Sequence, residues 1–214
     1  MPGGEQLQER ADVQQVVLSR HEFQEKAKEI HRQLGLDYQK VRGGIALLCS
    51  PLEIKGPEDL YSACETQEKL KILILDGVTD IHNAAAIIRT ASFYGVHKIL
   101  IGGRDSFKMT PSFFKIASGG PEHLDIIQAG SLPKVVRNIQ KRSVMVWALS
   151  EHADEDSIDP PSSKIGLVLG AEDRGVSHAL LRECEGALAL RPLGKSPSLN
   201  VSVAAAIAME RLFS

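Results

Sequence analysis

The feature of this 214-residue sequence that most limits its fold is a regular alternation of short apolar runs with helical segments after Lys71. The first run, residues 72–75, is apolar at every position, which is typical of a strand buried on both faces. Strands that alternate with helices form parallel sheets covered on both faces. The sequence therefore predicts an α/β fold with a mostly parallel sheet flanked by helices. Further strands are expected at residues 98–101, 124–127, 144–149, 165–169 and 187–190, and helices at 84–93, 112–116, 132–140, 176–181 and from 198 onward.

The first 70 residues are more polar and divide into two predicted segments. Ser19 is a preferred N-cap type before a helix predicted over residues 20–34, with strands predicted at 14–18 and 45–49. Such a piece is too small for a core of its own, so residues 1–51 are predicted to be a short N-terminal α/β extension. Residues 52–70 are predicted to be a helical linker, and residues 71–214 the main domain.

Charge, cysteine content and the lengths of the apolar runs indicate the compartment in which the protein is found. The formal net charge of -2 gives no general attraction to nucleic acid, although a local basic patch is enough to bind it. Cys49, Cys64 and Cys184 are scattered, which favours buried thiols in a reducing compartment. The N-terminus lacks the apolar run of a signal peptide, and the longest apolar run, residues 203–209, is too short to span a bilayer. We therefore expect a cytoplasmic protein without a membrane segment.

Polar segments follow two of the predicted strands, at the edge where a sheet of this kind binds its ligand. The first runs from Asp76 through Asn83, which is expected to cap the next helix, to Arg89 in an otherwise apolar stretch. Spacing alone allows Arg89 either a structural ion pair or an anionic ligand. The second segment, residues 170–177, contains Glu172 and brings backbone and one carboxylate to the same edge.

A third polar segment precedes the last helix. Ser198 is the expected N-cap of that helix, and Leu199, Val203 and Ile207 have the spacing of a buried stripe. Asn200 stands in the first turn, where a core helix needs no amide. Ser198 and Asn200 either cap the helix or line a site.

Common catalytic motifs are missing or incomplete. Residues 170–177 approach the phosphate-binding pattern G-x-x-x-x-G-K-[ST], but Val176 stands at the lysine position. Neither G-x-G-x-x-G nor G-x-S-x-G occurs, so a nicotinamide dehydrogenase and a serine hydrolase are unsupported. The histidines form no pattern such as H-E-x-x-H, and we expect no metal site.

Together, the three polar segments resemble the signature motifs of the SpoU-type (TrmH-like) branch of the SPOUT, or α/β-knot, RNA methyltransferases. The matching stretches are N-A-A-A-I-I-R-T-A at 83–91, L-V-L-G-A-E-D-R-G at 167–175, and R-P-L at 191–193 followed by S-L-N-V-S-V at 198–203. They occur in the family order within residues 71–213. Two positions depart from the family pattern: Ile81 replaces a usual proline and Ala85 a usual glycine.

The resemblance implies a fold and an activity. The fold includes a deep trefoil knot at the C-terminus, and the family is usually a homodimer with its active site near the subunit interface. The implied activity is methyl transfer from S-adenosylmethionine to a ribose 2'-hydroxyl of rRNA or tRNA. The alternatives are a catalytically silent knotted RNA-binding module and a base methyltransferase. Residues 1–51 resemble the last part of a small ribosomal-protein-like RNA-binding domain, in truncated or degenerate form.

The resemblance also implies site residues. Cofactor contacts, largely through backbone atoms, are implied for Leu149, Gly170, Leu190, Arg191 and Leu199, and Gly170 has no Cβ to block a close approach. Catalytic roles are implied for Arg89, Asn83, Glu172, Ser198 and Asn200.

Arg89 is the residue expected to act on the ribose. Family proposals let this arginine accept the hydroxyl proton, but arginine stays protonated in proteins, so we favour electrostatic stabilisation of the ribose oxygen. Asn83 would orient Arg89 or the ribose, and Glu172 a neighbouring group. Ser198 and Asn200 would fix the knot turn and line the pocket.

Overall fold

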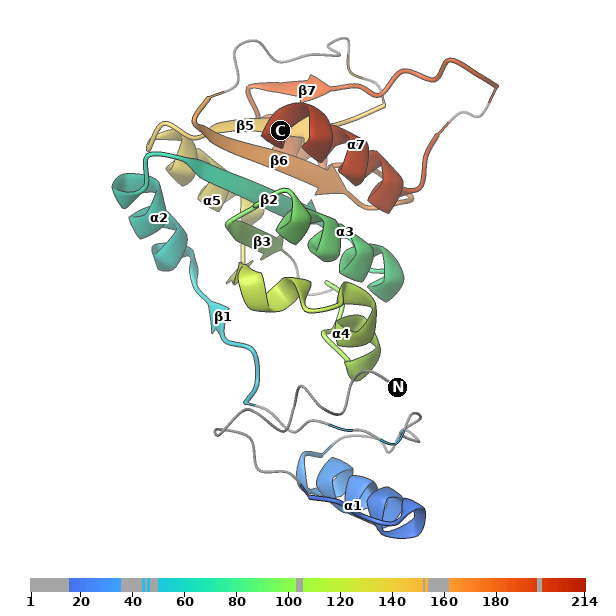
Figure 1. The fold of residues 1–214 in the computed structure, drawn as a ribbon. Helices are drawn as coiled ribbons and strands as arrows, with labels where there is room; N and C mark the ends of the chain where they lie inside the picture. Colours follow the sequence, from blue (N-terminus) through green and yellow to red (C-terminus); the bar gives the residue numbers. More distant parts are fainter. Residues whose placement is uncertain are drawn as a thin grey trace. The chain divides into compact units, whose positions relative to one another are not determined.

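The structure is a computed structural model that describes residues 16–35, 44, 46, 50–102, 106–151, 153, 162–195 and 198–214. Its chain divides into two compact units, residues 1–51 and 52–214 (Figure 1). In the described part of the first unit, α1 (Arg20–Gln33) begins at the predicted cap. Ser19 Oγ accepts the Glu22 N–H, and the Glu22 carboxylate accepts the Ser19 N–H, which together form a capping box. Residues 16–18, part of a predicted strand, have no regular structure, and most of 45–49 lies outside the described residues.

The second unit is an α/β domain built on one sheet. Seven strands among its described residues run in the order β1-β4-β3-β2-β6-β5-β7, and every neighbouring pair is parallel. The predicted parallel sheet is therefore confirmed. The strands are β1 (Ile54–Lys55), β2 (Leu70–Asp76), β3 (Lys98–Gly102), β4 (Asp125–Ala129), β5 (Met145–Leu149), β6 (Lys164–Gly170) and β7 (Gly186–Leu188). The helices are α2 (Pro57–Thr66), α3 (Ile81–Phe93), α4 (Pro111–Ala117), the 3-10 helix η1 (Gly120–His123), α5 (Leu132–Gln140), α6 (His178–Leu181) and α7 (Val201–Phe213).

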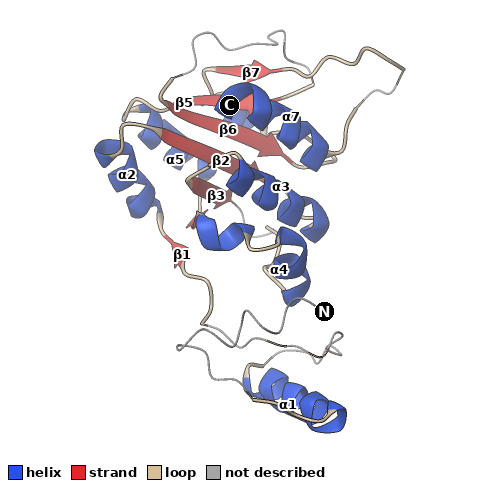
Figure 2. Cartoon of the chain, viewed as in Figure 1, coloured by secondary structure: helices blue, strands red, loops and turns tan. Residues whose placement is uncertain are grey.

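The sheet has a separate core on each face because side chains alternate along a strand. Leu73 and Leu75 of β2 join the core that contains residues of α3, α4 and α7, whereas Ile72 and Ile74 join the core that contains residues of α2, α5 and α6. Figure 2 shows the strands between these two layers of helices. Burial on both faces explains why residues 72–75 are continuously apolar.

The segment predicted to be a helical linker, residues 52–70, is part of the second unit. It contains α2, but it also adds β1 to the edge of the sheet, where Ile54 pairs with Ile126 of β4. Lys55 forms an ion pair of 2.7 Å with Asp125, and Leu60 of α2 is fully buried. These contacts make the segment an edge layer of the sheet instead of a free connection.

The chain winds outward from the centre of the sheet in two directions. From β2 it continues to β3 and β4 on one side, and β6, β5 and β7 lie on the other. β2 and β6 are neighbours, and their carboxyl ends meet where Asp76 pairs with Gly170. Open α/β sheets bind ligands at such a switch point, so the fold places a site after these two strands.

The last helix differs from the prediction at its start. Asn200, instead of Ser198, is the N-cap of α7, because its Oδ1 accepts the Ser202 N–H at 2.8 Å. Residues 196–197 lie outside the described residues, and the trefoil knot stays a prediction.

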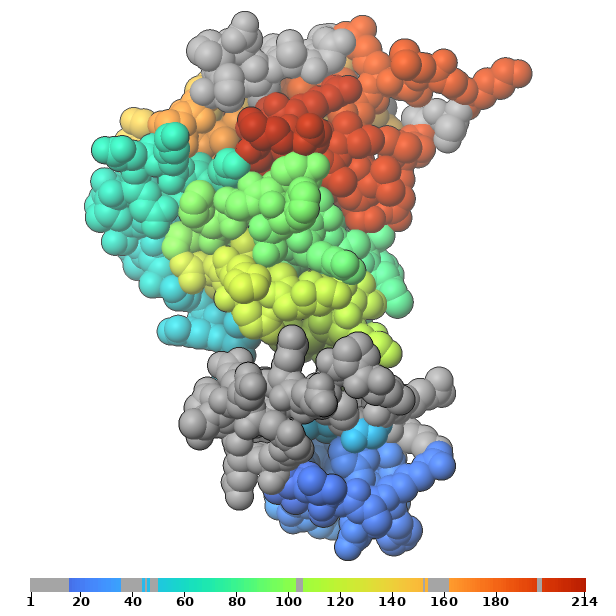
Figure 3. Space-filling view, in the orientation of Figure 1, coloured from blue at the N-terminus to red at the C-terminus, as the bar shows by residue number. Residues whose placement is uncertain are grey.

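The stripe of α7 that was predicted to be buried is exposed. Leu199, Val203 and Ile207 are 51%, 47% and 36% exposed. The helix packs on the sheet through a different face, made by Ala205, Ala208, Met209, Leu212 and Phe213. The spacing was right for one face of a helix, but the face that meets the sheet is a different one, which combines two alanines with Met209, Leu212 and Phe213. In Figure 3, α7 (dark red) adjoins α3 (green) on the surface of the domain.

The C-terminal ends of α3 and α7 are held by one lysine of β2. Lys71 Nζ donates to the carbonyl oxygen of Tyr94, the C-cap of α3, at 3.1 Å, and to the carbonyl oxygen of Phe213 at the end of α7. A lysine at helix C-termini satisfies carbonyl groups that have no partner within their helix. The two helices are therefore tied together at the edge of the sheet opposite the switch point.

We predict that His97 makes the domain less stable in mild acid. Burial and the charges of Lys71 and Lys98 lower the pKa of His97 below its usual 6.5, and its Nδ1 accepts the Lys71 N–H at 3.1 Å. The unfolded chain therefore binds the proton more tightly, and the free energy of unfolding should fall as the pH drops below about 6.5. Urea unfolding between pH 7.5 and 5.5 should show this fall, and His97→Gln should reduce it. An unchanged pH dependence in His97→Gln would contradict the prediction.

Candidate active site

Asn83 links the three polar segments of the sequence. It lies in the first turn of α3, where Asp80 is the N-cap and accepts the Asn83 N–H through Oδ1 at 2.8 Å. The predicted capping role of Asn83 is therefore wrong, and its side chain is available for other contacts. Its Nδ2 donates to Glu172 Oε1 at 2.8 Å, and its Oδ1 accepts Asn200 Nδ2 at 3.0 Å. One half-buried amide thus joins the ends of segments that are 89 and 117 residues away in sequence.

Glu172 is carried by a tight turn that follows β6. Ala171 and Gly175 exchange two backbone hydrogen bonds of 3.1 and 2.9 Å, which close the turn. A Cβ on Gly170 would lie 2.0 Å from the carbonyl carbon of Gly175 and 2.1 Å from Val176 N. Gly170 is thus required by the packing of the turn itself, a reason that differs from the predicted approach to a cofactor.

The same turn is tied to the neighbouring strand. The Ser177 N–H donates to Asp76 Oδ2 at 2.7 Å, at the carboxyl end of β2. This bond joins the turn that holds Glu172 to the strand that leads into α3. The sequence placed Asp76 in a polar segment but did not predict that it accepts a hydrogen bond from Ser177.

Asn200 caps the last helix and also contacts Asn83. Its Oδ1 caps α7 by accepting the Ser202 N–H at 2.8 Å, and it also accepts the Ser202 hydroxyl at 2.6 Å. Its Nδ2 is thereby directed to Asn83. Ser198 is exposed.

Arg89 is exposed on α3, and its side chain makes no hydrogen bond or ion pair with any residue that the structure describes. Six residues along a helix place it roughly 120° around the axis from Asn83, so the two side chains point in different directions. Within the described residues, no contact supports the structural ion pair. The guanidinium is therefore available for an anionic ligand.

The residues predicted to bind a cofactor follow adjacent strands. Leu149 ends β5 and Gly170 ends β6, while Leu190 follows β7, and these strands are neighbours in the sheet. The Ser150 N–H donates to the Leu188 carbonyl at 3.0 Å, which holds the ends of β5 and β7 together. Arg191 and Leu199 are exposed in the segment that leads to α7. Backbone polar groups beside apolar side chains fit the adenine and ribose of a nucleoside cofactor.

Three residues contribute to this region although the sequence did not predict a role for them: Asp80, Asp76 and Ser202. Asp80 caps α3 three residues before Asn83, a spacing typical of N-caps, so this role could have been found. Asp76 and Ser202 act through contacts that depend on the neighbouring strand and on the rotamer of Asn200. Those contacts have no signal in local sequence.

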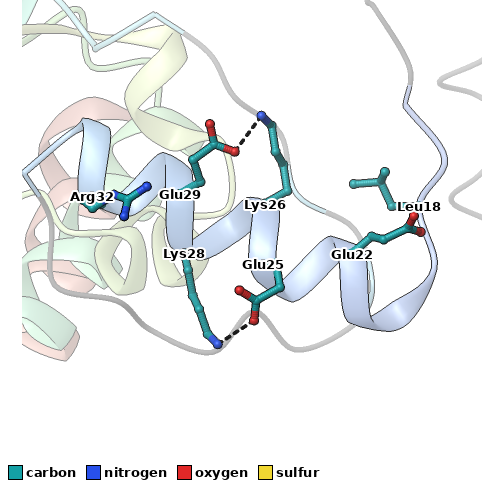
Figure 4. A pocket seen from close by; sticks show the side chains of 7 residues that line it. All are labelled: Leu18, Glu22, Glu25, Lys26, Lys28, Glu29 and Arg32. Carbon is teal, nitrogen blue, oxygen red and sulfur yellow. Dashed lines mark hydrogen bonds and ion pairs between the residues drawn. The ribbon is translucent and has the colours of Figure 1, made fainter.

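Other parts of the described structure offer weaker sites. A hollow along α1 is lined by Leu18, Glu22, Glu25, Lys26, Lys28, Glu29 and Arg32 (Figure 4). Two of its lysines pair with glutamates three residues away, at 2.8 and 2.7 Å, so the hollow presents no concentrated charge of one sign.

Reactive side chains elsewhere give little support for another kind of chemistry. Burial raises the pKa of the Cys64 thiol, and it raises the pKa of Cys184 to about 12, so the thiolate is suppressed in both. Cys49 lies outside the described residues. The described residues contain no group of three or more His, Cys, Asp or Glu side chains suited to a metal ion. None of the helices among these residues has the length and apolar character needed to cross a membrane.

Comparisons with known proteins point to one family. Residues 71–210 match the model of the SpoU rRNA Methylase family. The chain is 30% identical over 172 residues to "Putative TrmH family tRNA/rRNA methyltransferase YacO" of Bacillus subtilis, covering 79% of this chain and 69% of the relative. It is 31% identical over 170 residues to "23S rRNA (guanosine-2'-O-)-methyltransferase RlmB" of Acinetobacter baylyi, covering 78% and 68%.

Solved structures share the fold. The SpoU methyltransferase AviRb from Streptomyces viridochromogenes, in complex with AdoMet, matches with a TM-score of 0.64 at 22% identity, over 71% of this chain and 60% of that one. An AdoMet-bound rRNA methyltransferase from Sinorhizobium meliloti matches with a TM-score of 0.66 at 24% identity, over 75% and 60%. The chain thus spans 60% of the length of these two structures.

We predict that substitutions of Asn83 separate its two hydrogen bonds. Asn83→Ala removes both hydrogen bonds, each of which contributes about 0.5–1.5 kcal/mol to the free energy of unfolding. Because the amide is half-buried, we expect the total loss to lie near the lower end of the summed range. Asn83→Asp keeps an acceptor for Asn200 but places a second carboxylate next to Glu172. Because the two negative charges repel each other, Asn83→Asp should lower the free energy of unfolding at pH 7 by more than Asn83→Ala does. Protonation of either carboxyl removes the repulsion, and the excess cost should disappear towards pH 4.

Chemical unfolding of the two variants at pH 7 and pH 4 measures these differences. His82→Ala, a substitution at the adjacent exposed residue, is the control and should leave stability nearly unchanged. Equal stability of the Ala and Asp variants at both pH values would show that the contact with Glu172 is not formed.

Proposed function

Because this chain belongs to the SpoU rRNA Methylase family, we propose that it transfers a methyl group from S-adenosylmethionine to a ribose 2'-hydroxyl of rRNA or tRNA. The observation that carries the proposal is the hydrogen-bonded link from Glu172 through Asn83 to Asn200, which unites all three motif segments. The name of the Acinetobacter relative, a guanosine-2'-O-methyltransferase of 23S rRNA, supports the ribose as acceptor. AdoMet-bound neighbours support the catalytic interpretation over a silent binding module.

The cofactor fits the carboxyl edge of the sheet. When bound, S-adenosylmethionine supplies an electrophilic methyl group. The residues that would hold it are Leu149, Gly170, Leu190, Arg191 and Leu199, at the ends of three neighbouring strands and in the segment before α7. Their backbone groups would accept and donate hydrogen bonds to the adenine and ribose, and the apolar side chains would exclude water.

Arg89 would act on the ribose oxygen. Attack by a 2'-hydroxyl requires negative charge to develop on that oxygen, and a free guanidinium stabilises such charge and also binds a neighbouring phosphate. Arginine keeps its proton, so the proton released by the hydroxyl would pass to water, to which this face of α3 is exposed. The role of Arg89 is therefore electrostatic, together with positioning of the RNA backbone.

The other polar residues would position the reacting groups. Glu172 fixes the amide of Asn83, and Asn83 fixes Asn200 at the start of α7. This order matters because Asn200 follows directly on Leu199 of the cofactor segment. Ser198 would line the pocket on the same segment. Alignment of this kind can contribute large factors to a rate without any change in bonding.

The exposed apolar surface of α3 and α7 supports a homodimer. Phe93 is 83% exposed on α3, Val203 and Ile207 are exposed on α7, and Leu199 is exposed just before α7. The helices α3 and α7 adjoin each other on the surface (Figure 3). A second copy of the chain would cover these residues. Phe93 follows Arg89 by four residues and so shares its helix face, which would place Arg89 near the subunit interface.

The path of the C-terminus supports the knot. The chain leaves β7 at the edge of the sheet, yet α7 packs against α3 and β6 near the centre. We infer that the C-terminal segment passes through a loop formed by the preceding part of the chain, as the family resemblance implies.

We also infer a degenerate RNA-binding role for residues 1–51 and a cytoplasmic location, because the proposed substrates are rRNA or tRNA.

We predict that Arg89→Ala lowers the rate of methyl transfer at least about 100-fold, the loss typical of one removed charge-stabilising group. Arg89→Lys keeps the charge without the planar fork and should retain part of the rate. Binding of S-adenosylmethionine, measured by calorimetry, should stay within about twofold in both. The matched control is Arg182→Ala, an exposed arginine next to α6 on the other face of the sheet, which should leave the rate unchanged. A fully active Arg89→Ala variant would remove Arg89 from the reaction.

We predict that Val203→Asp with Ile207→Asp converts a dimer into a monomer. Both positions are on the exposed stripe, so two buried charges at an interface would oppose association while the fold is kept. Sedimentation should give about twice the chain mass of 23.3 kDa for the natural protein and 23.3 kDa for the variant. Lys134→Asp, an exposed change on α5 of the opposite face, is the control. A monomeric natural protein would contradict the dimer.

A further inference from the structure

The 3-10 helix η1 is pressed against the backbone of α3 at Arg89. A Cβ on Gly120 would lie 3.1 Å from Arg89 Cα, 3.3 Å from the Ile88 carbonyl oxygen and 3.4 Å from Arg89 N. All three neighbours are backbone atoms of a helix, so none of them can turn aside as a flexible side chain would. Gly120 is buried and its φ is not in the left-handed region, so close packing is the reason for a glycine here.

The turn before η1 is shaped to make this approach. α4 ends at Ser118 in the left-handed conformation, with φ of 49°, and Gly119 follows with φ of 81°. A left-handed serine is an unfavourable conformation, and such residues persist only where the surrounding structure determines them. Pro121 is buried next to Gly120 and stiffens the first turn of η1. The chain therefore accepts local strain to bring η1 onto α3.

We propose that Gly120 is a positioning residue for Arg89. The guanidinium of Arg89 has no partner among the described residues, so the backbone of α3 determines where that group stands before RNA binds. Gly120 touches that backbone at Arg89 itself, about 1.7 turns beyond Asn83. The link from Asn83 to Glu172 and Asn200 involves no atom of η1. This inference rests on the proposed function of Arg89.

A methyl group at this position tests the inference. In Gly120→Ala, η1 and α3 must separate by a few tenths of an ångström. Displacements near 1 Å cost roughly 100-fold in rate, so we expect kcat for methyl transfer to fall roughly tenfold. The KM for S-adenosylmethionine should stay within about twofold, because its proposed site lies on other segments.

The matched control is Gly166→Ala in β6. Its Cβ would lie 3.3 Å from Val146 Cγ2, a tight contact with a side chain in the core on the other face of the sheet. It should lower thermal stability without lowering kcat at a temperature where both variants are folded. Equal loss of kcat in the two variants, or no loss in Gly120→Ala, would overturn the proposal.

A double-mutant cycle distinguishes positioning from a general structural effect. If Gly120 acts through Arg89, the tenfold loss should shrink to less than about threefold in an Arg89→Lys background, where the flexible lysine no longer depends on the helix position. The same tenfold loss in both backgrounds would overturn the inference. A natural protein that transfers no methyl group would instead overturn the proposed function and the inference with it, whereas an active protein with an unaffected Gly120→Ala variant overturns the inference alone.

Discussion

The hydrogen bonds of the Asn83 amide are the interaction on which the rest of the site depends. Its nitrogen and its oxygen hold different segments, Glu172 after β6 and Asn200 before α7. Hydrogen bonds of this kind add only about 1 kcal/mol each to stability, so their importance lies in alignment. α3 and α7 are joined at their first turns by Asn83 and Asn200, and at their last turns by Lys71 through the carbonyl groups of Tyr94 and Phe213. Contacts at both ends fix how far one helix slides along the other.

The parallel sheet explains why such a link forms at all. β2 and β6 are central neighbours, and the chain leaves them in opposite directions, so the segments after both strands meet above the same edge. Asp76 and Ser177 add a second bond between these segments. The third segment arrives from the edge strand β7 and must cross back to reach α3. A fold with this winding brings polar side chains of all three segments to one edge of the sheet, next to the strand ends that we propose hold the cofactor.

Much of the fold could be predicted from the sequence because its signals are local. Residues 72–75 are apolar at every position since they are buried on both faces, and Ser19 stands at a capping-box spacing. The failures concern tertiary packing. The stripe of Leu199, Val203 and Ile207 has helical spacing, but spacing does not say whether the sheet or the surface receives it. The assignment of Asn83 as a cap failed because α3 begins earlier, with Asp80 as its N-cap, and because the partners of Asn83 are distant in sequence. Gly170 and Gly120 are glycines for close packing against backbone, which no local pattern reveals.

One amide gathers three chain segments into the site that we propose methylates ribose. The most direct measurement is the chemical position of the methyl group in RNA treated with the full chain and methyl-labelled S-adenosylmethionine. A methyl group on a ribose 2'-oxygen blocks alkaline cleavage of the adjacent phosphodiester, since that cleavage needs the free hydroxyl. If the ribose is methylated, the label is expected in alkali-resistant dinucleotides identified by mass spectrometry. Label found in mononucleotides, with the methyl group on the base, would contradict it.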